Sequence, residues 1–208
     1  MSLPEQNISE KIRKNENNDL IRYTDAELIS GKHQLVIING NGGAGKSTFA
    51  SFCIDYAKRK YKMYGAELST VDWPKEVARF CGWNGRKEEI DRKFLSDLKM
   101  ALEAWDDSPS RKVFEQILAY DNTKDWLVFV NCREPSNIER FIKMNKEMTH
   151  WPCLTLLVKN DRNPIITSNI GDASVFNYRY NKYIYNNFDL LTLRKMAEQF
   201  VDEIYTNL

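Results

Sequence analysis

Residues 40–48 combine glycines, one lysine and two hydroxyl side chains in a spacing that suits phosphate binding. They read Gly-Asn-Gly-Gly-Ala-Gly-Lys-Ser-Thr and fit the pattern G-x-x-x-x-G-K-[ST] of a P-loop. Glycines let backbone N–H groups converge on phosphate oxygens without a clash from Cβ. Lys46 is expected to reach the β- and γ-phosphates of a nucleotide, and Ser47 to offer its hydroxyl to Mg²⁺. We therefore predict that ATP and Mg²⁺ bind at Gly40, Asn41, Gly42, Gly43, Ala44, Gly45, Lys46, Ser47 and Thr48.

The segments on both sides of this loop support the assignment. Residues 34–39 are mostly apolar and rich in β-branched side chains, which is typical of a short buried parallel strand. Residues 48–57 carry apolar side chains at 49, 53 and 57, the spacing of one helix face. Strand, glycine-rich loop and helix follow in the order that phosphate binding needs, because the helix then points its positive end at the phosphates. Thr48 is expected to pack on the helix or to contact the α-phosphate.

The composition limits the classes of protein to consider. The chain has 208 residues, enough for one globular domain, and a net charge of +1 from 30 basic and 29 acidic side chains, which gives no reason to expect a nucleic-acid partner. No apolar run approaches the ~18 residues of a membrane helix, and no signal peptide is evident. The four cysteines form no C-x-x-C pair, so we expect no zinc site and predict reduced core thiols in a cytoplasmic protein.

The remaining sequence predicts an α/β protein. Further strands are expected at 66–71, 126–131, 154–158 and 183–185, alternating with helices that begin near Trp73, Glu88, Ser108, Ser136 and Asp189. This alternation predicts a three-layer sandwich, in which about five parallel strands are covered by helices on both faces. In the helix after Glu88, one face carries Ile90, Phe94, Leu98, Leu102 and Trp105. Residues 1–30 form a polar extension, expected to contain one short helix or to stay loose, and 31–208 form one domain.

A P-loop alone does not fix the type of reaction, but other motifs of P-loop proteins are missing. We find no D-x-x-G switch and no N-K-x-D guanine motif; Lys159, Asn160 and Asp161 hold similar letters in the wrong order. A transporter ATPase would need a signature loop and a longer chain. A small kinase therefore remains as the preferred interpretation.

The chain resembles the P-loop nucleotide kinase superfamily, most of all deoxynucleoside monophosphate kinases and their dephospho-coenzyme A kinase relatives. The resemblance covers about residues 34–207, and its motifs lie at 67–70, 74–79, 91–98, 130–134 and 183–193. It implies an acceptor-binding region at about 67–120 and a small lid at about 159–175. It also implies transfer of the γ-phosphate of ATP to a small phosphorylated acceptor, with a (deoxy)nucleoside monophosphate as the favoured one.

Phosphoryl transfer depends on cations around the moving group. Beside Lys46, the candidates for a catalytic role are Arg92, Arg133 and Arg162. Arg162 is the first candidate for an arginine of the lid, and Arg179 is the second. The candidates for binding the acceptor are Ser69, Asp72, Arg79 and Arg92. Each arginine could instead form a surface ion pair. Trp73, Trp83 and Trp105 could stack on a base, although core packing is the favoured interpretation.

One position departs from the nucleotide kinase pattern. Many such kinases place an aspartate at the tip of the third strand, where this chain has Asn131. Glu134 is therefore the candidate to join Ser47 in holding Mg²⁺, with Asp72 as an alternative; Asp72 or Glu67 could also accept a proton from an acceptor hydroxyl. Two other functions stay open: a catalytically weak or inactive ATP-binding homologue, and an NTPase that needs no acceptor. The sequence leaves open whether the protein is a monomer or a homodimer.

Overall fold

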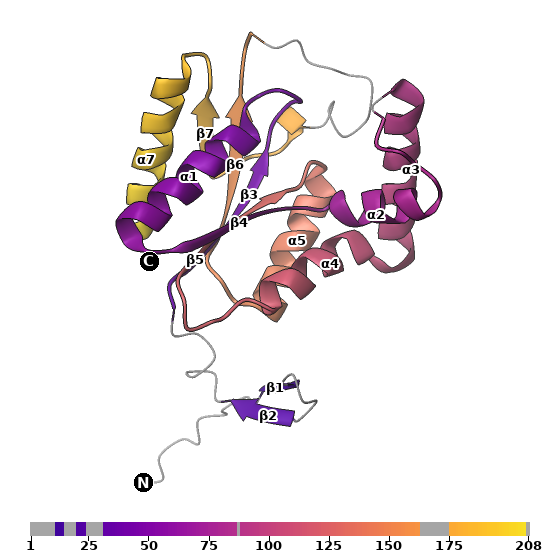
Figure 1. The fold of residues 1–208 in the computed structure, drawn as a ribbon, viewed down its shortest axis with the longest axis horizontal. Helices are drawn as coiled ribbons and strands as arrows, with labels where there is room; N and C mark the ends of the chain where they lie inside the picture. The colour runs from indigo at the N-terminus through magenta and orange to yellow at the C-terminus, as the bar shows by residue number, and fades with distance from the viewer. Residues whose placement is uncertain (1–10, 15–19, 24–30, 87, 163–174, 207–208) are drawn as a thin grey trace.

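The computed structural model describes residues 11–14, 20–23, 31–86, 88–162 and 175–206. Its main sheet has five parallel strands, which lie in the order β4-β5-β3-β6-β7 (Figure 1). The strands are β3 (His33–Asn39), β4 (Tyr64–Ser69), β5 (Trp126–Asn131), β6 (Cys153–Lys159) and β7 (Lys182–Tyr185). The P-loop strand β3 is central, which agrees with the apolar run of residues 35–38 and with the burial of all its residues.

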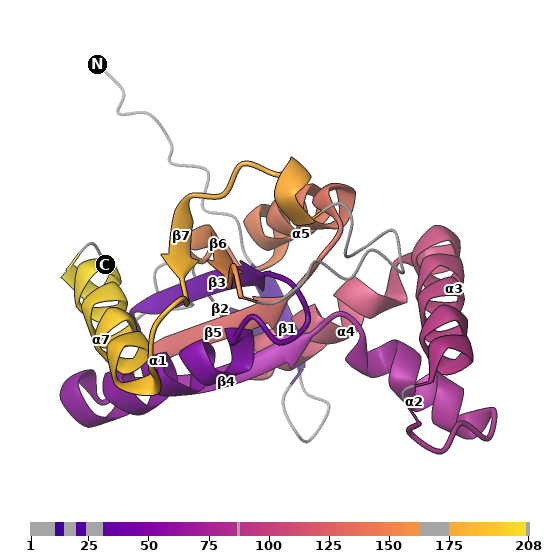
Figure 2. The same cartoon turned by 90° about the horizontal axis from the view of Figure 1, so that it is seen from above.

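Helices cover both faces of this sheet, as the alternation of strands and helices predicted. They are α1 (Lys46–Tyr61), α2 (Asp72–Phe80), α3 (Glu89–Asp106), α4 (Ser108–Leu118), α5 (Pro135–Met148) and α7 (Leu190–Thr206), and η1 (Val175–Asn177) is a short 3₁₀ helix. Since successive side chains of a strand point to opposite faces, Val36 and Ile38 pack with α1 and α7, whereas Leu35 and Ile37 pack with α4 and α5. Figure 2 shows α1 and α7 on one side of the sheet and α5 on the other. The three-layer α/β prediction is confirmed.

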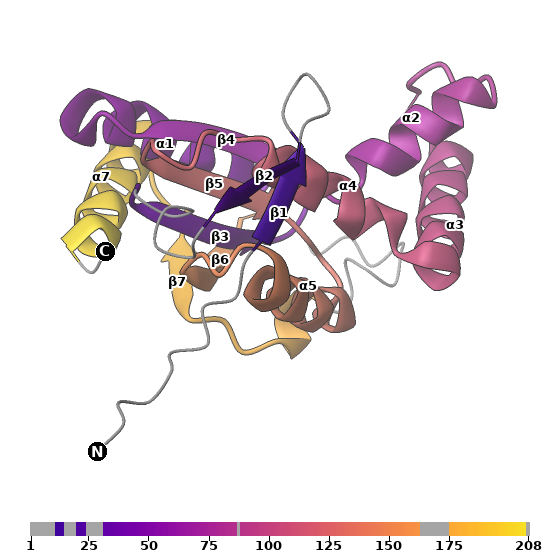
Figure 3. The same cartoon turned by 90° about the horizontal axis from the view of Figure 1, so that it is seen from below.

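Helices α2 and α3 extend beyond these layers. Helix α3 packs against α2 and α4 and lies at the outer edge of the molecule in all three views (Figure 3). The apolar face that its sequence predicted exists, but most of it points outward: Ile90 is 71% exposed and Trp105 is 80% exposed. Core packing of Trp105 was therefore a wrong prediction. The side of α3 that faces the protein buries Asp91 and Lys99 instead.

The N-terminal extension contains strands where a short helix or a loose chain was expected. Strands β1 (Lys11–Lys14) and β2 (Leu20–Tyr23) pair antiparallel and form a separate two-stranded sheet. Both segments contain charged and apolar residues in alternating or mixed order. In a segment this short, such a pattern is compatible with a strand as well as with a helix. No helix among the described residues is long and apolar enough to cross a membrane.

The cysteines are all free, as expected, but they do not share one environment. Cys53 and Cys132 are buried, and burial raises the pKa of the Cys132 thiol to about 12. Cys153 is partly buried, and its thiol pKa is raised to about 12 for the same reason. Cys81 is exposed, because it directly follows the last turn of α2 at the surface, so its assignment to the core was wrong.

Candidate active site

The loop of residues 40–45 has a backbone shape that its glycines make possible. Gly40, Gly43 and Gly45 have φ angles of 145°, 76° and 96°, which other residues rarely adopt. Space is also limited, since a Cβ at Gly40 would lie 2.1 Å from the carbonyl oxygen of Val158. A Cβ at Gly45 would lie 2.4 Å from Nδ2 of Asn186, an amide that donates to the carbonyl of Ala44 at 2.9 Å. The loop is thus held between the ends of β6 and β7.

The side chain of Lys46 folds back across the loop that the glycines form. The Lys46 ammonium donates to the carbonyls of Gly40 at 2.7 Å and Asn41 at 2.9 Å. Helix α1 begins at Lys46, its preceding residue Gly45 provides no side-chain cap, and its first turn contains no acidic residue. Backbone N–H groups at such a helix start favour an anion. The predicted nucleotide-binding residues 40–48 therefore form a cationic, concave loop at the carboxyl end of the central strand.

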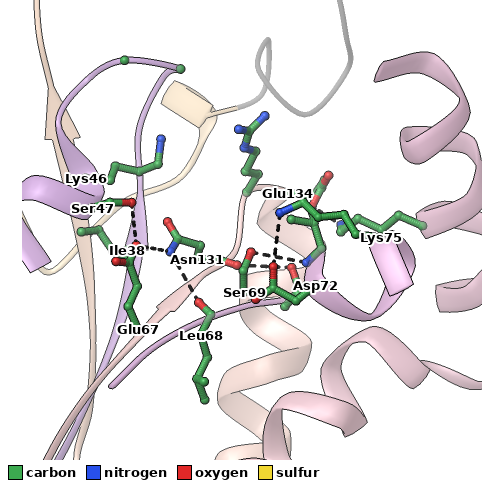
Figure 4. Close-up of a pocket in the computed structure, with 16 residues that line it drawn as sticks. Ile38, Lys46, Ser47, Glu67, Leu68, Ser69, Asp72, Lys75, Asn131 and Glu134 are labelled. Carbon is green, nitrogen blue, oxygen red and sulfur yellow. Dashed lines mark hydrogen bonds and ion pairs between the residues drawn. The ribbon is translucent and has the colours of Figure 1, made fainter. Parts of the chain in front are cut away.

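A cavity of about 600 Å³ opens beside this loop (Figure 4). Its walls come from the P-loop, from the segment that joins β4 to α2, from the segment that joins β5 to α5, and from Lys99 of α3. The segments meet because Ile38, Ser69 and Asn131 lie in one row of the sheet, at the carboxyl ends of neighbouring parallel strands. Ligands of open α/β sheets bind at this edge.

The cavity wall nearest the P-loop holds a carboxylate that was not proposed for metal binding. Oε1 of Glu67 accepts a hydrogen bond from the Ser47 hydroxyl at 2.7 Å and another from the Asn131 amide at 2.8 Å (Figure 4). The contacts thus bring the Ser47 hydroxyl and the Glu67 carboxylate together, and the amide nitrogen of Asn131 holds the carboxylate in place. Such hard oxygen donors suit Mg²⁺, which uses few protein ligands and keeps several waters. Glu67 can supply the negative charge that Asn131 lacks.

Glu134, the carboxylate proposed to bind metal with Ser47, lines the same cavity but is bonded elsewhere. Its Oε2 accepts from the Lys99 ammonium at 2.7 Å and from the Asn137 amide at 3.1 Å. Burial works against the charged carboxylate, but the attraction of Lys99 outweighs it, so the pKa of Glu134 lies below its ordinary value. The structure gives Glu67, and not Glu134, the direct contact with Ser47.

Lys99 is the centre of a buried ring of charged and polar side chains. Besides Glu134, its ammonium contacts Oε1 of Glu103 at 2.6 Å, and the Asn137 amide donates to that same oxygen at 2.9 Å. Burial alone would lower the pKa of Lys99, but Glu134 and Glu103 raise it above its ordinary value. The ring joins α3 to the start of α5 and so fixes the wall that carries Arg133.

The far wall of the cavity contains several of the residues proposed to bind the acceptor. Ser69 and Asp72 line it, together with Thr70, Lys75 and Arg133. Lys75 contacts Asp72 at 3.2 Å across one turn of α2. The position of Arg133 is set by Asn39, a fully buried residue whose amide donates to the Arg133 carbonyl at 2.8 Å.

Four other arginines proposed for the site do not line the cavity. Arg79 is exposed on α2, with its guanidinium 5.7 Å from the ring centre of Trp83. Arg92 is exposed on the first turns of α3. Arg162 follows β6 and donates to the carbonyl of Asn187, and Arg179 is also exposed. Most of the proposed lid, residues 159–175, lies outside the described residues.

Sequence reasoning passed over Lys75, Lys99 and Asn39. Lys75 lies three residues after Asp72 in a predicted helix, so its place beside Asp72 could have been inferred from helix spacing. Lys99 gave no such signal, because a lysine on a charged helix is usually exposed. Glu67 had been considered only as a contact of an acceptor hydroxyl, since nothing in the sequence shows that β4 lies next to β5.

Only the structure of this chain, and not its sequence, matches known proteins. No protein-family model matches the sequence, and no curated protein matches it. The Mycobacterium tuberculosis APS kinase CysC in complex with AMPPNP and APS aligns with a TM-score of 0.53 and 11% sequence identity, over 84% of this chain and 99% of that one. Thymidylate kinase from Ehrlichia chaffeensis aligns with a TM-score of 0.45 and 11% identity, over 82% and 99% of the two chains.

The fold is a parallel α/β sheet covered on both faces, with the P-loop after its central strand, and it is similar to the fold of the APS kinase structure. The strand order, the P-loop on the central strand and the alignment with the APS kinase structure agree on this point. At such low sequence identity, the likeness concerns the fold, and the chemistry has to be argued from the residues of the cavity.

Proposed function

We propose that the protein is an ATP-dependent phosphotransferase. The observation that carries this proposal is a cavity that is lined both by the P-loop residues Lys46 and Ser47 and by Asp72, Lys75 and Arg133. One end of the cavity suits the phosphates of a donor nucleotide, and the other end offers polar and charged groups for an acceptor. A cytoplasmic location, where thiols stay reduced, fits the four free cysteines.

In the proposed reaction, an oxygen of the acceptor forms a bond to the γ-phosphorus while the bond to the β–γ bridging oxygen breaks, and ADP leaves. The Lys46 ammonium and the N-terminal amides of α1 would stabilise the negative charge on the donor phosphates. Ser47 and Glu67 would hold Mg²⁺, with the Asn131 amide orienting the Glu67 carboxylate, and the ion when bound neutralises charge on the β- and γ-phosphates. Arg133 and Lys75 would offset the charge of an anionic acceptor as it approaches.

We further propose that the acceptor is a small phosphorylated molecule, with a (deoxy)nucleoside monophosphate as the favoured candidate. Its phosphate would lie between Lys75 and Arg133, because Arg79 and Arg92 do not line the cavity. Asp72, at the start of α2 and 3.2 Å from Lys75, would contact a donor group of the acceptor or accept a proton from an attacking hydroxyl.

An inactive ATP-binding homologue is the second candidate, and the amide of Asn131 is the observation that favours it. Without a carboxylate at this strand tip, the cavity depends on Glu67 for negative charge near Ser47. An NTPase that needs no acceptor is the third candidate. The two alternatives differ from a kinase in what they do with ATP: the first releases no ADP, and the second releases it without an acceptor.

The test is ADP release from Mg·ATP, measured with a panel of nucleoside monophosphates, nucleosides and dephospho-coenzyme A. A kinase should release little ADP until one acceptor is added, and the phosphorylated acceptor should be found by mass spectrometry. Lys46→Ala should abolish transfer and leave the circular dichroism spectrum unchanged. Wild-type turnover in that variant would remove the P-loop from the mechanism, and ADP release that no acceptor accelerates would favour the NTPase.

A further inference from the structure

The proposed reaction makes no direct use of Asn39, although its position in the fold is unusual. Asn39 ends the central strand β3, directly before the P-loop, and its side chain is fully buried. It does not line the cavity, so it is not placed to contact ATP or an acceptor there. A buried amide is unfavourable unless its donors and its acceptor are hydrogen-bonded. The role of Asn39 therefore follows from the groups to which it is bonded.

The hydrogen bonds of Asn39 fix the orientation of its amide. Its Oδ1 accepts from the N–H of Gly40 at 2.8 Å, and its Nδ2 donates to the Arg133 carbonyl and to the Tyr180 hydroxyl, both at 2.8 Å. The Tyr180 hydroxyl gives its single proton to the Val175 carbonyl at 2.7 Å, so its oxygen has to accept from Asn39. A rotated amide would turn its oxygen toward the Arg133 carbonyl and its nitrogen toward the N–H of Gly40, which excludes that orientation.

This hydrogen-bonded group is shielded from water. Asn39 is completely buried and Tyr180 is almost completely buried. Burial raises the pKa of the Tyr180 hydroxyl above its ordinary value, so the hydroxyl keeps its proton at neutral pH. Hydrogen bonds between buried groups keep one arrangement, because water does not compete for the partners. Asn39 is therefore a rigid connection between the groups that it bonds.

Two of these groups belong to opposite ends of the cavity. Gly40 begins the P-loop, which is proposed to hold the donor phosphates, and Arg133 belongs to the acceptor end. The main chains of β3 and β5 are still joined where the N–H of Cys132 donates to the Ile38 carbonyl at 3.4 Å. One residue further along both strands, the side chain of Asn39 takes the place of a backbone donor to Arg133. Asn39 thus joins the two ends where the strands separate to form the cavity.

Asparagine is the side chain that suits this place. It combines one acceptor with two N–H donors on a single planar group. Aspartate has the same shape but lacks the two donors when it is ionised, and glutamine is longer by one methylene group. The positions of the groups around the phosphates matter, since a shift of about 1 Å can lower the rate of a reaction by about 100-fold. The precise placement of Arg133 is therefore important for the proposed reaction.

We propose that Asn39 is a positioning residue for phosphoryl transfer, which holds Arg133 at a fixed place relative to the start of the P-loop. It acts through the backbone of Arg133 and touches neither substrate. This inference rests on the proposed phosphotransferase function, because it concerns the placement of a residue at the acceptor end of the cavity.

Steady-state kinetics of Asn39→Ala, with Asn145→Ala as the matched control, test the proposal. Asn145 is also buried, and its amide donates to the Trp151 carbonyl at 2.8 Å, but it lies at the other end of α5 and does not line the cavity. Asn39→Ala should lower kcat/KM for the acceptor by about tenfold or more, as expected for a misplaced group. The dissociation constant for ATP should rise by less than about threefold, because Lys46 and the amides of α1 remain. Asn145→Ala should change neither quantity.

Equal losses of kcat/KM in Asn39→Ala and Asn145→Ala would overturn the proposal, because they would follow from the loss of any buried amide. If Asn39→Ala does not fold, Asn39→Asp takes its place, with Asn145→Asp as its control. Asn39→Asp keeps an acceptor for the N–H of Gly40 but lacks the amide donors, so the same loss of kcat/KM is expected.

A double-mutant cycle with Arg133→Ala tests whether Asn39 acts through Arg133. Arg133→Ala keeps the carbonyl that Asn39 bonds but removes the guanidinium. In this background there is no guanidinium left to misplace, so Asn39→Ala should lower kcat/KM further by less than about threefold. A further loss as large as that in the wild-type background would overturn the proposal.

Titration with inorganic phosphate separates this proposal from the proposed function. Phosphate is added to the protein in the presence of Mg²⁺ and AMPPNP, and it should bind about tenfold or more weakly to Asn39→Ala and to Arg133→Ala than to the wild type. This pattern without transfer to any acceptor would overturn the proposed function but support the role of Asn39. Equal phosphate affinities of the wild type and Asn39→Ala would overturn the role of Asn39 alone. A wild type that neither binds phosphate nor transfers it would overturn both.

Discussion

At the scale of single residues, the site depends on where one carboxylate lies. Glu67 accepts hydrogen bonds from both Ser47 and Asn131, whereas Glu134 is bonded by Lys99 and Asn137. The residue types proposed to hold Mg²⁺ were therefore evident in the sequence, but the sequence did not show which of two glutamates lies beside Ser47. That choice follows from strand order: β4 lies beside β5, which places Glu67 near the P-loop.

Replacing Glu67 tests its assigned role. Glu67→Gln keeps the shape of the side chain but removes its charge, so we expect the Mg²⁺ concentration needed for half-maximal activity to rise about 10- to 100-fold. The same change at Glu76, an exposed carboxylate on α2, is the control and should have no effect. Equal Mg²⁺ requirements for the Gln variants at 67 and 76 would contradict the assignment of Glu67.

Two glycines of the P-loop provide a matched pair for the backbone. Gly45 has a φ of 96° and no room for a Cβ, whereas a Cβ at Gly42 would meet nothing within 4 Å. Gly45→Ala should therefore lower the free energy of unfolding by about 1–2 kcal/mol or more and weaken ATP binding. Gly42→Ala should change the free energy of unfolding by less than about 0.5 kcal/mol. Urea denaturation measures both, and equal losses of stability would show that the loop geometry is not as described.

At the scale of secondary structure elements, α3 is held to the protein through charge more than through apolar packing. Its buried Lys99 bonds to Glu103 on the same helix and to Glu134 at the start of α5. The sequence predicted the limits of α3 and its apolar stripe well, because both follow from residue spacing. It could not predict which side faces inward, since that depends on partners on α5 that are more than 30 residues away in sequence.

Two lysines on α3 allow the contribution of a buried ion pair to stability to be compared with that of an exposed one. Lys99→Met leaves the carboxylates of Glu103 and Glu134 buried without their cation, so we expect a loss of about 3–5 kcal/mol in the free energy of unfolding. Lys93→Met removes only the exposed pair with Asp97 and should cost about 1 kcal/mol or less. Thermal or urea denaturation of the two variants measures the difference, and similar losses would contradict the described role of Lys99.

At the scale of the whole molecule, most of the fold was predictable and most of the acceptor side was not. All five strands of the main sheet were located from apolar runs, because a sheet covered on both faces needs them. The arginines proposed at positions 79, 92 and 162 failed to line the cavity, because a resemblance in short motifs does not fix the direction of a long side chain. Strand order alone brought Ser69, Asn131 and the P-loop together.

The stability of the whole domain should also depend on pH through one histidine. His33 is buried at the start of β3 and stacks on Trp151 with ring centres 4.3 Å apart. Burial lowers its pKa below 6.5, although Asp125 opposes this effect. The unfolded chain therefore takes up the proton more readily, so stability is fully present above pH 6.5 and falls as the pH drops from there toward the lower pKa of the folded state. The slope cannot exceed about 1.4 kcal/mol per pH unit.

His33→Phe keeps a ring to stack on Trp151 but cannot be protonated, so it should flatten this part of the stability curve. His150→Gln is the control, because the other histidine of the chain is exposed and its replacement should leave the curve unchanged. Urea denaturation between pH 5 and 7.5 gives the comparison. An unchanged slope in His33→Phe would assign the pH dependence to other groups.

The central claim is that residues 40–48 bind the triphosphate of a nucleotide. Isothermal titration of the protein with ATP and Mg²⁺ tests it most directly, in the wild type and in Lys46→Ala. We expect one site per chain in the wild type and an affinity at least tenfold weaker in the variant, whose circular dichroism spectrum stays the same. Equal affinities for ATP, or no binding by the folded wild-type protein, would contradict the claim.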